Sequence, residues 1–180
     1  LVSDQPGVAP VTDPDLVNAW GLTSSPTSPW WVSDNGTNLS TLYNGAGQPF
    51  PPATPLVVSV PGSPTGVVFN GGTQFQVPNG AVMAPARFIF ATQSGTILGW
   101  AGGPAAQLGK DRSSFGASYF GLAINGDRLY AADFHNRRIE VFDGTTTPPR
   151  RHPSPQRGLP GGHGLYIVER LSDRWGTSIH

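Results

Sequence analysis

The sequence has no cysteine, a single methionine and little charge, since Asp, Glu, Lys and Arg make up only 12% of its 180 residues. Without cysteine, the chain has no disulfide, no thiol nucleophile and no cysteine-ligated zinc. No apolar run approaches the roughly 18 residues that a membrane-spanning helix requires, so we expect no membrane span. The chain begins at Leu1 without a signal-peptide pattern, which is typical of a mature or trimmed product.

Basic residues are absent from the first half of the chain. Residues 1–86 contain four aspartates and neither Lys nor Arg, whereas residues 87–180 hold all eleven basic and seven acidic residues. The basic residues are not interleaved with aromatic ones, as they are on nucleic-acid-binding surfaces. We therefore expect no nucleic-acid partner.

Glycine and proline are abundant instead, with 24 and 19 residues. Such a composition with low charge is also found in disordered chains, but 37% hydrophobic residues, including five Trp and nine Phe, favour a folded core. Many turn-forming residues between short apolar segments indicate an all-β fold.

Three segments of the chain, residues 19–47, 64–103 and 119–144, share one plan. Each begins with a glycine followed by an apolar residue, at Gly21, Gly66 and Gly121. An apolar strand, a polar turn and an alternating strand follow: "WWVSD", "RFIFAT" and "LYAAD" are the apolar strands. A repeat of about 40–50 residues built from short strands is typical of a β-propeller blade. The sequence therefore predicts that residues 1–144 form a partial β-propeller of about three blades, with "NGGTQFQVPNGAVMAP" as an inserted loop.

Long motifs within residues 1–144 resemble an uncharacterised family of bacterial β-propeller-like proteins. They are "LVSDQPGVAPVTDPDLVNAWGL", "WWVSDNGTNLSTLYNGAGQP", "GSPTGVVFNG", "ARFIFATQSGTILGW" and "YFGLAINGDRLYAADFHNRRIEVFDG". The resemblance implies a propeller fold and export to the cell envelope or the extracellular space, with no established activity. Family members are about twice as long as this chain, and their later repeats complete the ring.

The remainder departs from that family. Residues 145–160 are predicted to be a Pro- and Arg-rich linker, and residues 161–180 a short C-terminal helix. "GLPGGHGLYIVERLSDRWGTS" resembles the glycine-rich lid end of anti-sigma-factor kinases and related ATPases. The helix that supplies their magnesium ligands and the segment that binds adenine are missing, so we expect no nucleotide site.

The stretch "LYAADFHNRRIEVFDG" supplies the catalytic candidates, Asp133 and His135. Strand alternation predicts that these two side chains point the same way. The positions that correspond to Asp133 in the other repeats are Asp34 and Thr92. In propeller hydrolases, carboxylates from several blades converge on a central calcium ion, and the threonine weakens that pattern here. Turn formation is the alternative role for these Asx residues.

Four residues are candidates for ligand binding: Asp34, Asn35, Trp31 and Asn136. The tryptophans either pack between blades or form a stacking platform for a sugar. The glycine-rich "NGGTQ" lacks the Lys-Ser/Thr of a phosphate loop.

The sequence thus predicts an exported binding or scaffold module without catalytic activity, metal or cofactor. Its ligand would be a small molecule, a glycan or a protein, and exposed blade edges would permit self-association. The alternative is a metal-dependent hydrolase of the lactonase or esterase type, in which calcium would be the cofactor.

Overall fold

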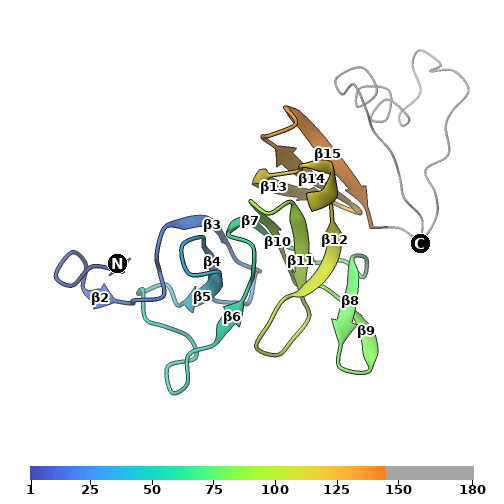
Figure 1. The fold of residues 1–180 in the computed structure, drawn as a ribbon. Helices are drawn as coiled ribbons and strands as arrows, with labels where there is room; N and C mark the ends of the chain where they lie inside the picture. Colours follow the sequence, from blue (N-terminus) through green and yellow to red (C-terminus); the bar gives the residue numbers. More distant parts are fainter. Residues whose placement is uncertain (145–180) are drawn as a thin grey trace, which may run out of the picture.

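The computed structural model describes residues 1–144, and the linker and C-terminal helix predicted for residues 145–180 lie outside this range. Three antiparallel sheets dominate the described chain (Figure 1). The first sheet contains β3 (Ala19–Thr23), β4 (Trp30–Asp34), β5 (Leu39–Tyr43) and β6 (Val57–Ser59). The second contains β7 (Pro64–Phe69), β10 (Phe88–Thr92), β11 (Thr96–Trp100) and β12 (Gln107–Asp111). The third contains β13 (Tyr119–Asn125), β14 (Arg128–Asp133) and β15 (Arg138–Asp143).

Smaller elements complete the described fold. β1 (Val2–Ser3) and β2 (Val11–Thr12) form a short parallel pair, and η1 (Ser113–Phe115) is a 3-10 turn. The segment predicted to be an inserted loop instead forms a hairpin of β8 (Gln76–Asn79) and β9 (Val82–Pro85). No α-helix occurs in residues 1–144, so the predicted all-β class is confirmed for this part of the chain.

Each of the three sheets is a meander whose strands follow one another in the chain, apart from the β8–β9 hairpin inserted after β7. Their first strands lie side by side, with β7 between β3 and β13 (Figure 1). Gly21 and Gly66 permit this approach. A Cβ atom on Gly21 would lie 2.7 Å from the amide nitrogen of Val67, and one on Gly66 would lie 2.7 Å from that of Leu122.

Two hydrophobic clusters hold the three sheets together. Between the first and second sheets, Trp31 stacks on Phe88 with ring centroids 4.1 Å apart. Between the second and third sheets, Ile89 packs with the fully buried Tyr119 and Leu129. The second sheet is therefore covered on both faces, and every residue of β10 is buried, as the apolar sequence predicts.

The third sheet is covered on one face only by the described residues. β14 alternates between buried and more accessible residues, because its outer face has no neighbouring sheet within residues 1–144. We call this outer face the third-sheet free face; the strand register places four residues on it: Tyr130, Ala132, Ile139 and Val141.

The alternation predicted for β15 is present, but the polar residues are on the side that faces the second sheet. The Glu140 carboxylate accepts hydrogen bonds from the Arg112 guanidinium, at 2.8 and 2.6 Å, and from the Tyr119 hydroxyl. Ile139, on the opposite side, is 60% exposed. A paired charge thus occupies the buried side and an aliphatic side chain the open one.

Candidate functional site

The turn after the second strand of each sheet is built in the same way. The residue that follows Asp34, Thr92 or Asp133 donates its backbone N–H to a carbonyl just before the first strand of that sheet. These bonds are Asn35 to Asn18 at 3.2 Å, Gln93 to Ser63 at 3.0 Å and Phe134 to Ser118 at 2.9 Å. The structure therefore gives these three positions the equivalence that the repeat predicts.

Asp133 is 1% exposed, and its carboxylate is fully engaged in holding this turn together. It accepts hydrogen bonds from the Asn136 carboxamide at 2.8 Å, the Ser118 amide at 3.1 Å and the Arg138 guanidinium at 3.1 Å. Burial alone would raise the pKa of Asp133, but these donors hold it below its ordinary value. The carboxylate therefore anchors the turn as an anion.

His135 does not share the environment of Asp133. Its side chain is exposed and lies beside Gly116, and in residues 1–144 no hydrogen bond joins it to Asp133. The prediction that both side chains point the same way is therefore wrong. β14 ends at Asp133, and the chain then turns through Arg137, whose φ is +54°, so strand alternation does not continue to position 135.

Asp34 has the opposite electrostatic state to Asp133. It is fully buried, and among the described residues only Thr41 offers donors to its carboxylate, at a geometry too poor for a full hydrogen bond. Burial raises the pKa of Asp34 to about 7, the neighbouring Thr41 opposes the rise, and the charges of Asp13 and Asp15 add to it. Asp34 therefore lacks the solvent access that ligand binding would require.

Two further predicted ligand residues, Trp31 and Asn35, join the first sheet to the second. Trp31 is 2% exposed in the hydrophobic cluster. The Asn35 carboxamide donates to the Pro64 carbonyl at 3.2 Å and accepts from the Asn18 carboxamide at 3.0 Å. These contacts give both residues a structural role at the interface between the first and second sheets.

The structure does not unite the predicted site residues. One set lies in the first sheet and the other, which includes Asn136, in the third, and no described hydrogen bond, ion pair or ring contact connects the sets. Within residues 1–144, no group of three or more His, Asp or Glu side chains is placed to hold a metal ion. The convergence that the hydrolase hypothesis requires is not seen in this part of the chain.

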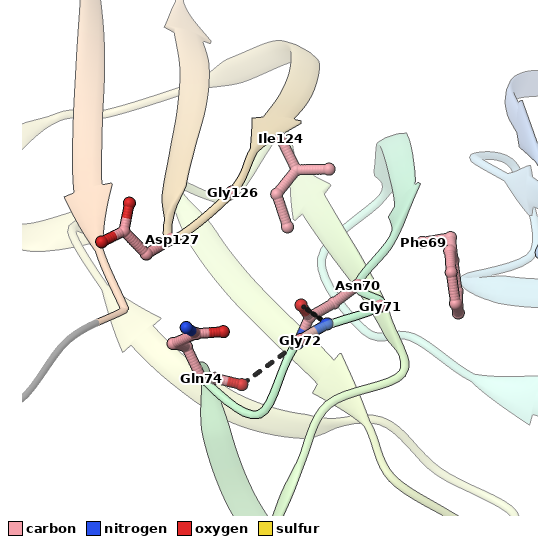
Figure 2. Close-up of a pocket in the computed structure, with 8 residues that line it drawn as sticks. All are labelled: Phe69, Asn70, Gly71, Gly72, Gln74, Ile124, Gly126 and Asp127. Carbon is pink, nitrogen blue, oxygen red and sulfur yellow. Dashed lines mark hydrogen bonds between the residues drawn. The ribbon is translucent and has the colours of Figure 1, made fainter.

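A pocket of about 520 Å³ lies elsewhere, between the loop that follows β7 and the turn that joins β13 to β14 (Figure 2). Its lining consists of Phe69, Asn70, Gly71, Gly72, Gln74, Ile124, Gly126 and Asp127. No motif in the sequence predicted this pocket. The available signal was the dipeptide Asn-Gly, which lies at the end of the first strand in the second and third repeats, at residues 70–71 and 125–126.

Asn70 fixes one wall of this pocket. Its carboxamide nitrogen donates to the Gln74 and Ala86 carbonyls at 3.1 and 2.9 Å, and its oxygen accepts from the Gly72 amide at 3.0 Å. The carboxamide of Gln74 and the carboxylate of Asp127 have no hydrogen-bond partner among residues 1–144. Both residues line the pocket.

No helix in the described part of the chain is both long and apolar enough to cross a membrane.

Comparisons with known proteins give relatives but no family. No family model and no solved structure matches the chain. It is similar to two uncharacterised proteins of Acanthamoeba polyphaga mimivirus, R648 and L690, each 28% identical over 152 residues. The alignments cover 79% of this chain but 37% and 40% of those proteins. A third uncharacterised mimivirus protein, R640, is 35% identical over 86 residues, covering 44% of this chain and 16% of its own length. The chain thus spans about two fifths of the length of the first two relatives.

Proposed function

We propose that the chain is an exported binding or scaffold module of the β-propeller type. The observation that carries this proposal is the serial packing of three equivalent sheets. β7 packs between β3 and β13, and glycines at equivalent positions let each first strand approach the next. Radial repetition of such sheets is the principle of a propeller.

The resemblance of residues 1–144 to exported bacterial β-propeller-like proteins supports the same proposal. It also supports placement in the cell envelope or the extracellular space. The first two relatives are about two and a half times as long as the part of them that aligns with this chain. Their remaining length leaves room for further repeats of this kind.

Self-association follows from the third-sheet free face. In the first sheet, the residues equivalent to Tyr130 and Ala132 are Trp31 and Ser33, which are buried against the second sheet. In the third sheet the same face carries Ile139, which is 60% exposed. An apolar sheet face without cover costs free energy in water, so this face should pack against another copy of the chain.

Size-exclusion chromatography with light scattering tests this proposal. We expect the wild-type chain to be a dimer or larger, and Ile139→Lys to shift it toward the monomer. Leu108→Lys is the matched control, because Leu108 is 54% exposed on β12 of the second sheet, away from the third-sheet free face. A wild-type chain that stays monomeric and stable at high concentration would overturn the proposed association.

A further inference from the structure

We propose that the pocket between residues 70–74 and 124–127 binds a neutral sugar. This inference rests on the proposed binding function and gives that function a ligand class. Figure 2 shows the Asp127 carboxylate and the Gln74 side chain on one side of the pocket, with Ile124 above and Phe69 at the far end. The site therefore combines two polar groups with an apolar part.

The hydrogen-bonding groups of the pocket match those of vicinal hydroxyls. The Asp127 carboxylate only accepts hydrogen bonds, whereas the Gln74 carboxamide both donates and accepts. A sugar hydroxyl donates to the first and accepts from the second. The Ile124 side chain supplies the apolar surface against which the C–H groups of a sugar ring pack, whereas the Phe69 ring packs on Phe88 at the other face of the second sheet.

Other ligand classes fit the lining less well. No Lys, Arg or His lines the pocket, so an anionic ligand would meet the Asp127 carboxylate without a compensating cation. Calcium takes six to eight oxygen ligands, and a single carboxylate supplies too few. An ammonium ion would pair with the Asp127 carboxylate but would leave the amide hydrogens of Gln74 without an acceptor. A ligand that is both donor and acceptor satisfies both groups.

The loop that carries Gln74 is preorganised. The three hydrogen bonds of Asn70 fix the turn through Gly71 and Gly72. A Cβ atom on Gly72 would overlap the Oε1 atom of Gln74, so the carboxamide lies directly over the glycine. Glycine at position 72 thus positions the side chain that binds, and preorganisation lowers the entropy cost of binding.

NMR titration of the 180-residue chain tests the site. The probes are methyl α-glucopyranoside, methyl α-mannopyranoside, methyl β-galactopyranoside and N-acetylglucosamine, each added to millimolar concentration. We expect at least one of them to shift the backbone amides of Gly71, Gly72 and Gly126 and the side-chain amide of Gln74. No shift with any probe, or shifts confined to other regions, would overturn the proposal.

Three variants identify the binding groups. Asp127→Asn should weaken binding about tenfold, because it replaces a charged acceptor by a neutral one. Gln74→Ala should weaken it to a similar extent. Gly72→Ala should preserve the fold, since only the flexible end of Gln74 must move, and should still weaken binding.

Asp4→Asn and Gly45→Ala are the matched controls, because both residues lie outside the pocket and a Cβ atom on Gly45 meets nothing within 4 Å. Equal affinity of Asp127→Asn and wild type would overturn the assignment. So would binding of cyclohexylammonium in preference to every neutral sugar. Ile139→Lys separates the two proposals. If this variant binds sugar as tightly as the wild type does, the sugar site does not depend on self-association.

Discussion

Asp34 and Asp133 occupy the same position in two repeats, yet their carboxyl groups differ in electrostatic state. Asp133 is ionised because Asn136, Ser118 and Arg138 donate to it. Asp34 is buried with only the weak donors of Thr41 beside its carboxyl group, and burial raises its pKa to about 7. The environment, rather than the residue type, therefore decides whether the carboxyl group stabilises its turn at neutral pH.

This difference predicts an unusual pH dependence of stability. The folded chain keeps the Asp34 proton up to about pH 7, whereas the unfolded chain loses it near the ordinary value of 3.8. Between these values the folded state binds more protons, so the contribution of Asp34 to the free energy of unfolding falls by up to about 1.4 kcal/mol per pH unit as the pH rises. Above about pH 7 this contribution no longer changes. Asp34→Asn should remove the fall and make the chain more stable than wild type at about pH 8.

Urea unfolding at about pH 5 and about pH 8 measures the effect. Asp4→Asn, which changes an accessible carboxyl group, should leave the wild-type difference between the two pH values intact. If Asp34→Asn retains that difference as well, burial of Asp34 is not its cause.

Asn136→Ala tests the opposite case. Removing the carboxamide deletes the 2.8 Å hydrogen bond to the Asp133 carboxylate, so the pKa of Asp133 should rise and the free energy of unfolding at neutral pH should fall by about 1–3 kcal/mol. Carboxyl ¹³C NMR follows the pKa, and urea unfolding follows the stability. A lower stability with an unchanged Asp133 pKa would show that Asn136 acts through its bond to the Phe115 carbonyl instead.

The sequence predicted the equivalence of these aspartates but not their states. The short repeat pattern places each aspartate at the end of its strand, which local sequence encodes. Part of each environment is distant in the sequence: Ser118 lies fifteen residues from Asp133, and Asp13 lies twenty-one residues before Asp34. The pocket escaped prediction for the same reason, because Gln74 lies in the loop after β7 and Asp127 in the turn between β13 and β14, and the two meet only in the fold.

At the scale of the elements, recurring glycines determine how the sheets pack. Gly66 has no room for a side chain. A Cβ atom there would lie 2.6 Å from the Cβ atom of Leu122 and 2.7 Å from the backbone nitrogen of Leu122. Gly121 is the equivalent residue of the third sheet, but a Cβ atom there would lie 3.6 Å from Ala132, an ordinary contact. Glycine at this repeat position is therefore required for packing only where the first strand of the next sheet lies against it.

We therefore expect Gly66→Ala to destabilise the chain by about 1–3 kcal/mol, because backbone atoms of β13 must move to admit the methyl group. Gly121→Ala should change the free energy of unfolding by less than about 0.5 kcal/mol. Chemical denaturation of both variants provides the comparison. Equal destabilisation would mean that backbone entropy or strand propensity, rather than close packing of first strands, explains the glycines.

Elements with a regular pattern were predictable and irregular ones were not. The apolar strand β10 and the alternating strand β15 follow directly from their sequences. The β8–β9 hairpin was predicted as a loop, because its two strands have four residues each and both contain proline. Alternation alone does not say which side of β15 packs inward, and the polar side does so because Arg112 and Tyr119 meet Glu140 there.

At the scale of the whole molecule, the two ends of the series of sheets differ. The N-terminal segment is tied to the first sheet by hydrogen bonds from the Tyr43 hydroxyl to the Asp13 carboxylate and from the Thr37 hydroxyl to the Asp15 carbonyl, both 2.7 Å long. The third-sheet free face has no such cover within residues 1–144. This asymmetry is the reason for assigning the proposed self-association to the third sheet.

The second sheet couples the two ends of the described fold. It contributes Phe88 to the cluster shared with the first sheet and Ile89 to the cluster shared with the third, from adjacent positions of β10. Loss of either interface therefore exposes one side of the same strand. In repeat architectures, stability depends on such nearest-neighbour interfaces as well as on each unit.

We predict that both interfaces unfold in one transition. Trp31→Ala in the first cluster and Leu129→Ala in the second should lower the free energy of unfolding by about 3–5 and 2–5 kcal/mol respectively, because each leaves a cavity at a fully packed position. Hydrogen exchange followed by mass spectrometry should show reduced protection in all three sheets for either variant, with the second sheet as the shared element. If Trp31→Ala instead releases only residues 19–59 while β10 and β14 keep their protection, the first sheet is an independent unit, and the close contacts of Gly21 with β7 do not transmit stability between sheets.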